Sequence, residues 1–156
     1  MNYRIRDLAN GHEELLMRSN LGGYVSHPHF SPNYEQVAIF WITEHTGLYV
    51  LSWPSRELRF LAPDLAPIGW SEDGEWIYAL QAVQPFKAQN STSALMRVSP
   101  RTSRVELIGS FPRGYLTRGS CSLTPDRQAI ICALAESNSD AWIIDDFDPD
   151  MHSEKR

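Results

Sequence analysis

The hydrophobic and polar positions of this chain follow one pattern that recurs three times. Each copy has a large apolar residue, a hydroxyl residue, a short polar turn and then an apolar run. A short apolar run between turn residues is typical of a strand that is buried on both faces. The copies span residues 30–40, 70–80 and 123–133.

The first copy predicts a unit of four short strands, and Phe30 begins its repeat. A turn at 31–34 leads into the apolar run Val37–Ile42. Pro suits this turn because its ring fixes φ, and Asn suits it because it tolerates a left-handed conformation. Further strands are predicted at 48–53 and 58–61. We predict that the residues from Leu21 to Pro28 are a connection.

The second copy predicts the same order of strands with one insertion. Its turn at 72–74 leads into an apolar run at 76–83. The polar segment 84–93 follows and is predicted to be an inserted loop. The last two strands of this unit are predicted at 94–98 and 105–108.

The two ends of the chain predict incomplete units. At the N-terminus, Tyr3 and Ile5 alternate with polar residues, and Asn10-Gly11 is a turn signal before 13–17. This pattern favours a two-stranded hairpin. The third copy predicts strands at 120–123, 129–134 and 141–144.

The spacing of the copies predicts the fold class. Their hydroxyl residues Ser31, Ser71 and Thr124 lie 40 and 53 residues apart, and the longer interval contains the inserted loop. A period of about forty residues with four short strands is the signature of a propeller blade. We predict an all-β partial β-propeller of about three four-stranded antiparallel blades. The predicted units are a partial blade at 1–20, blades at 24–62 and 64–110, an incomplete blade at 115–148, and a polar tail at 149–156.

The repeated residues resemble the WD40-like "PD40" repeat of TolB-type β-propellers. The similarity is clearest in Phe30-Ser31-Pro32-Asn33 with Val37-Ala38-Ile39, followed by Gly47-Leu48-Tyr49-Val50, and in Trp70-Ser71-Glu72-Asp73-Gly74. The third copy and the tail around Trp142 match more loosely. Related propellers accompany the hydrolase domain of dipeptidyl-peptidase-IV-like enzymes, so the resemblance implies a gating role there. Such repeats indicate a fold and do not specify a function.

The predicted blade count is low for a closed ring. Closed propellers have four to eight blades, and an open arc leaves exposed sheet edges that favour aggregation. We therefore expect other copies of the chain, a partner or a larger protein to complete the ring. A direct clasp between copies would join three C-terminal strands to two N-terminal strands. It would produce a five-stranded junction or displace one strand.

Composition and charge narrow the function classes. A chain of 156 residues can bury one core. The formal net charge of −5 argues against a nucleic-acid binder, which would normally have a basic face. No apolar run is long enough to span a bilayer, and the first residues do not resemble a secretory signal. As written, the sequence predicts a cytoplasmic protein; a missing leader or preceding domain would allow a periplasmic or extracellular one.

The candidate catalytic and metal-binding residues favour a protein without an active site or cofactor. The chain has no Gly-x-Ser-x-Gly motif, and no base accompanies Ser120 or Cys121. His27 and His29 share one face of an extended segment, which would suit two metal ligands, but a third is not visible nearby. Loop histidines are the alternative. The acidic residues of the tail, Asp145, Asp146, Asp148 and Asp150, fit a solvated surface better than a calcium site.

The two cysteines are predicted to lie on neighbouring strands. Cys121 and Cys132 are nearly equidistant from a turn centred near residue 126, so they face each other across the predicted ladder. In a reducing compartment they would be two small buried residues, which is the interpretation that the composition favours. A cross-strand disulfide is the alternative.

Loops are where a propeller carries its function, because the sheets hold them rigidly. The inserted loop and the turn at 45–47 are therefore the predicted binding surface, represented by His45, Phe86, Lys87, Gln89 and Asn90. We predict a non-catalytic scaffold that binds a protein or a peptide. The alternatives are an accessory propeller that gates or regulates a peptidase, hydrolase or kinase, and a self-assembled ring that binds a small ligand or metal in its channel.

Overall fold

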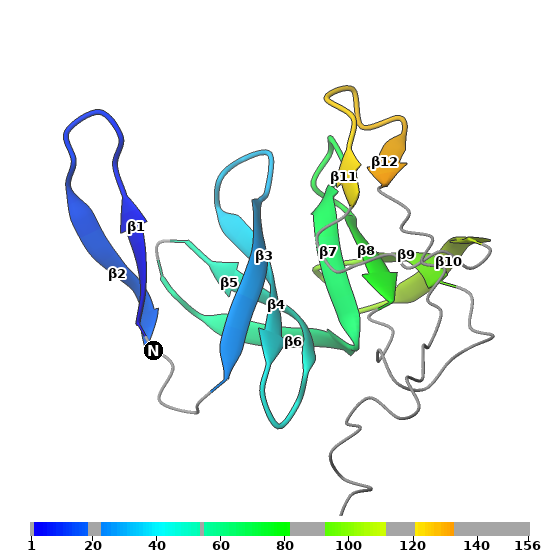
Figure 1. Cartoon of the computed structure of the whole chain (residues 1–156), viewed down its shortest axis with the longest axis horizontal. Coiled ribbons are helices and arrows are strands. Elements are labelled where there is room, and N and C mark those ends of the chain that lie inside the picture. Colours follow the sequence, from blue (N-terminus) through cyan, green and yellow to red (C-terminus); the bar gives the residue numbers. More distant parts are fainter. Residues whose placement is uncertain (1, 19–22, 54, 82–92, 112–120, 133–156) are drawn as a thin grey trace, which may run out of the picture.

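The computed structural model describes residues 2–18, 23–53, 55–81, 93–111 and 121–132, which form four antiparallel sheets placed side by side (Figure 1). The first sheet pairs β1 (Asn2–Arg6) with β2 (Glu13–Arg18). The second contains β3 (Tyr24–Phe30), β4 (Gln36–Ile42), β5 (Gly47–Ser52) and β6 (Leu58–Pro63). The third contains β7 (Leu65–Trp70), β8 (Ile77–Gln81), β9 (Ser93–Val98) and β10 (Val105–Phe111). The fourth pairs β11 (Cys121–Leu123) with β12 (Ile130–Cys132).

Each four-stranded sheet follows the chain order, so neighbouring strands are joined by hairpin connections. The orders are β3-β4-β5-β6 and β7-β8-β9-β10. The described residues contain no helix. The predicted all-β class with four-stranded antiparallel sheets is confirmed.

The sheets pack face to face, which explains the apolar runs. Along β4, Val37 and Ile39 face the β1–β2 hairpin, whereas Ala38 faces the β7–β10 sheet. Successive side chains of a strand point to opposite faces, so a strand between two neighbours must be apolar on both. All five residues from Val37 to Trp41 are buried.

Apolar clusters between neighbouring sheets hold the four sheets together. The cluster between the two complete sheets is built around Leu48, Val50, Trp70 and Ile77. The β1–β2 hairpin contributes Leu16 and Met17 to a second cluster on the β3–β6 sheet, and β11–β12 forms a third with the β7–β10 sheet. Each unit therefore covers one face of the next, as the blade repeat predicts.

The innermost strands approach each other closely. β7 packs against β3 on one side and β11 on the other, and the Trp70 indole N–H donates to the His29 carbonyl at 2.8 Å. A Cβ atom at Gly69 would lie 2.5 Å from Leu123 Cδ1. Glycine at this position lets β11 sit directly on β7.

Two sequence predictions about the strands are wrong. The segment from Leu21 to Pro28 was expected to be a connection, but β3 begins at Tyr24. Its polar residues and Pro28 are not typical of a strand in sequence, and a bulge between Ser26 and His29 accommodates the proline. The run at 129–134 was expected to be buried, but Ile131 on β12 is 68% exposed.

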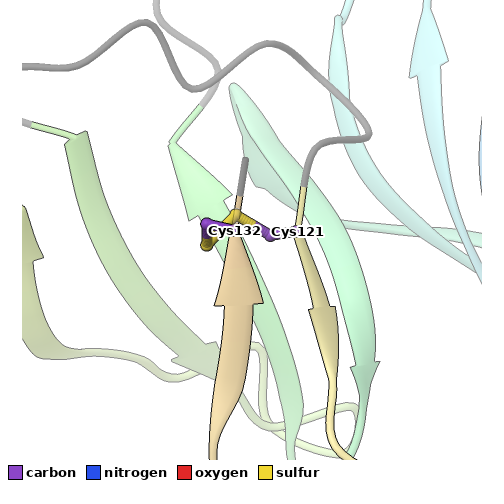
Figure 2. The surroundings of a disulfide bond; sticks show 2 residues. All are labelled: Cys121 and Cys132. Carbon is purple, nitrogen blue, oxygen red and sulfur yellow. A yellow bond between two sulfur atoms is a disulfide. The ribbon is translucent and has the colours of Figure 1, made fainter. Parts of the chain in front are cut away.

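The preferred interpretation of the cysteines is also wrong. Cys121 and Cys132 are direct partners in the β11–β12 register, as predicted, and a disulfide joins them (Figure 2). Their Cα atoms are 4.1 Å apart. The cross-strand disulfide, the alternative in the sequence analysis, is therefore the one the structure contains.

Candidate functional site at the two ends of the sheets

The connections between strands define two ends of the stacked sheets. We call the end that carries the turns before β4, β8 and β12 the turn end (upper part of Figure 1). The opposite end carries the β4–β5 turn and the β8–β9 connection, and we call it the loop end.

Three turns of the turn end share one hydrogen-bond pattern. In each, the first residue donates its backbone N–H to the carbonyl five residues later, and the residue three positions on donates back to the first carbonyl. That fourth residue has a positive φ in all three turns: Tyr34, Gly74 and Arg127. We call these first-type turns; they begin at Ser31, Ser71 and Thr124.

Side chains reinforce each first-type turn. The Ser71 hydroxyl donates to Asp73 Oδ1 at 2.6 Å, and it accepts the backbone N–H of Trp76 at 2.9 Å. Thr124 and Asp126 make the same pair in the third turn. In the first, Asn33 replaces the aspartate and accepts from Ser31 at 2.7 Å. The hydroxyl residue that marks the sequence repeat is therefore the residue that closes the turn.

These contacts shift the titration of the two turn aspartates. The Ser71 hydroxyl and the Glu75 backbone N–H lower the pKa of Asp73 below its ordinary value of 3.8. Thr124 and the backbone N–H of Gln128 lower the pKa of Asp126 in the same way. Hydrogen bonds to a carboxylate favour its charged form.

Three other turns at the same end follow a second pattern. The first residue again donates to the carbonyl five residues later, but the residue four positions on returns the bond. That fifth residue has a positive φ in each case: Gly11, Arg56 and Ser103. We call these second-type turns; they begin at Asp7, Ser52 and Ser99.

A shallow depression lies where the first-type turns meet. It encloses about 360 Å³ and is lined by Pro32, Glu72, Pro125, Asp126 and Arg127. The Arg127 guanidinium donates to the Ser71 carbonyl at 3.3 Å and so links two of the turns. These turns are recognisable as repeats in the sequence, but the common surface that they form is not evident from it.

His45, a predicted binding residue, lies exposed at the loop end. Its turn is fixed by the Thr46 hydroxyl, which donates to the Thr43 carbonyl at 2.8 Å. The Tyr49 hydroxyl donates to the His45 carbonyl at 2.7 Å, and the Tyr49 ring packs between Trp41 and Phe60. The backbone that carries the His45 side chain is therefore held from inside the sheet.

The other predicted binding residues lie outside the described residues. Phe86, Lys87, Gln89 and Asn90 belong to the connection between β8 and β9. β8 ends at Gln81 beside the first residue of β7, as β4 ends at Ile42 beside the first residue of β3. The connection therefore starts from the same end as the His45 turn.

The histidine pair lies on β3, beside the bulge. His27 has a φ of 55°, which breaks the strand alternation on which the expectation of a shared face rested. Burial lowers the pKa of His29, the charge of His27 lowers it further, and a hydrogen bond with the Pro67 backbone opposes both. Within the described ranges, no three His, Cys, Asp or Glu side chains gather into a group that could hold a metal ion.

The remaining candidates add no site to the described part of the chain. Ser120 and the four tail aspartates lie outside it. The Cys121 sulfur is bonded to Cys132. No helix among the described residues is long and apolar enough to cross a membrane.

Comparison with solved structures shows the fold. The chain is similar to TolB from Acinetobacter baumannii, with a TM-score of 0.60 and 15% identity over 83% of this chain. It is also similar to an oligogalacturonate lyase in complex with manganese, with a TM-score of 0.61 and 13% identity over 84% of this chain. It spans 31% and 35% of those two chains. Both are β-propeller proteins, so the predicted partial β-propeller is confirmed.

The sequence itself matches no protein-family model and no curated protein. At this level of identity, the similarity to solved structures establishes the architecture alone.

Proposed function

We propose that this chain is a non-catalytic β-propeller module that binds a protein or a peptide at its loop end. We further propose that its repeats are of the PD40 type. The three first-type turns support that assignment, because their shared hydroxyl and Asn or Asp residues follow the repeat motif.

The observation that carries the binding proposal is the construction of the His45 turn. His45 and Glu44 are exposed, while hydrogen bonds from Thr46 and Tyr49 fix the backbone below them. A surface that is already ordered loses less conformational entropy when it binds. The connection that begins at the same end contains Phe86, and aromatic residues are enriched at protein interfaces; it also contains the cationic residue Lys87.

A selection from a displayed library of random peptides tests the proposal. Peptides selected on the wild-type chain should bind about tenfold more weakly to a His45→Ala, Phe86→Ala, Lys87→Ala variant. Glu57→Ala, an exposed position at the turn end, is the matched control and should bind as the wild type does. Equal binding to the loop-end variant, or no selectable peptide, would overturn the proposal.

A further inference from the structure

The two hairpins at the ends of the described chain are different halves of a four-stranded sheet. In the complete sheets, a first-type turn joins the first and second strands, and a second-type turn joins the third and fourth. The β1–β2 hairpin has a second-type turn, which begins at Asp7. The β11–β12 hairpin has a first-type turn, which begins at Thr124. One hairpin therefore corresponds to the outer half of a sheet and the other to the inner half.

Each hairpin packs against the complete sheet next to it, as one blade packs against its neighbour. β1–β2 is tied to the β3–β6 sheet by Arg56–Glu14, at 2.9 Å, and by the Val25 N–H, which donates to the Tyr3 hydroxyl at 2.7 Å. β11–β12 packs on the β7–β10 sheet through Cys121 and Leu123. Both half-sheets thus already occupy the position of a neighbouring blade.

Exposed apolar side chains lie at positions that a neighbouring half-sheet would cover. Phe30 and Trp70 occupy the same position, directly before a first-type turn, and both are directed toward the preceding unit. Trp70 is 3% exposed because β3 and β4 cover it, whereas Phe30 is 42% exposed. The hairpin that precedes Phe30 corresponds to the outer half of a sheet, and among the described residues no inner strands cover Phe30.

The β11–β12 hairpin, at the other end of the stacked sheets, also has an exposed apolar residue. Ile131, Ala38 and Tyr78 share one position on the second strand, directed toward the following unit. Ala38 is buried by the next sheet, and Tyr78 is half-buried against β11–β12. Ile131 is 68% exposed. Ile131 therefore lies exposed at the position that the following unit covers in the two complete sheets.

We propose that a second copy of this chain completes both half-sheets. β12 of one copy would pair antiparallel with β1 of the other, as β4 pairs with β5 and β8 with β9. The two composite sheets, together with two complete sheets from each copy, form a closed ring of six four-stranded blades. Such a ring lies within the range of known propellers, and twofold symmetry removes the open edges.

Charge substitutions at the two exposed positions test this arrangement. In sedimentation velocity, the wild-type chain should be a dimer, and Ile131→Lys or Phe30→Glu should weaken the dimer at least about tenfold. The chain that carries both substitutions should dimerise better than either single variant, because the two charges then face each other across the interface. Leu107→Lys, on the outer strand β10, is the control and should stay dimeric.

A photocrosslink gives a second readout if a charged variant fails to fold. Benzoylphenylalanine at position 131 should link two chains through a peptide that contains Phe30, and the same group at position 107 should not. A wild-type monomer at all concentrations would overturn the proposal. So would variants that dimerise as the control does, or links from position 131 that stay within one chain.

Discussion

Single residues at the first-type turns give the fold a specific pH dependence. The pKa values of Asp73 and Asp126 are lowered in the folded chain, first of all by hydrogen bonds from Ser71 and Thr124. The stabilisation is therefore complete above the unfolded value of 3.8 and is lost as the pH falls through the lower folded values.

We expect an Asp73→Asn, Asp126→Asn chain to lose less stability than the wild type when the pH falls from about 5 to about 2. Urea unfolding at each pH measures the difference, and Asp64→Asn, outside the first-type turns, is the control. Asn33 is a neutral residue at the position that Asp73 and Asp126 occupy in the other two turns. Asn33→Asp should therefore increase the loss of stability at low pH. Parallel curves for all four proteins would contradict the assigned role of the turn carboxylates.

Glycine is required at one turn position for conformational reasons. Gly74 has a φ of 72°, and an added Cβ would meet nothing closer than Pro32 Cδ at 3.7 Å. We expect Gly74→Ala to destabilise the chain by about 1 kcal/mol through backbone strain. Gly109→Ala is the control, because a Cβ there has no neighbour within 4 Å and the backbone is not left-handed. Equal unfolding midpoints for the two variants in urea would exclude this explanation.

At the scale of elements, the disulfide is expected to hold the shortest hairpin together. β11 and β12 have three residues each, and an isolated two-stranded hairpin is marginal in water. We expect a Cys121→Ala, Cys132→Ala chain to lose about 2–3 kcal/mol of hairpin stability. Hydrogen exchange of the β11–β12 amides should show the loss, and a dithiol reductant should reproduce it in the wild type but not in the variant. If the β11–β12 amides of the variant exchange as slowly as those of the wild type, packing on β7 alone holds the hairpin together.

The sequence predicted the elements that have strong local signals. The apolar run of β4 and the Ser-Glu-Asp-Gly turn before β8 follow directly from burial on two faces and from turn chemistry. β3 was missed because its Ser, His and Pro residues resemble a loop, and only the bulge lets them join a sheet. The exposure of Ile131 depends on what covers β12, which no local pattern reveals.

The candidate sites were predictable only in part, for a similar reason. His45 could be chosen because a polar turn between two apolar runs must reach the surface. The depression beside Arg127 is formed by turns that begin at Ser31, Ser71 and Thr124, far apart in the sequence. Their convergence is a consequence of sheet stacking. The difference between the two turn types is not visible in the sequence either, because it lies in which backbone N–H closes the turn.

At the scale of the whole molecule, the described residues form an arc with a two-stranded hairpin at each end. The clasp predicted from the sequence joined three strands to two, whereas the described hairpins contribute two and two. The turn types show that these pairs are complementary, so the described strands fit a four-stranded composite. The strand predicted at 141–144 lies outside the described residues. A closed ring would also bring two copies of the loop end onto one face, where a partner could contact both.

The molar mass of the wild-type chain in solution tests this account most directly. Light scattering during size exclusion, over a hundredfold range of concentration, should give twice the 17.8 kDa of one chain throughout. A single mass of 17.8 kDa at every concentration, or a mass that keeps rising with concentration, would contradict a ring closed by two copies.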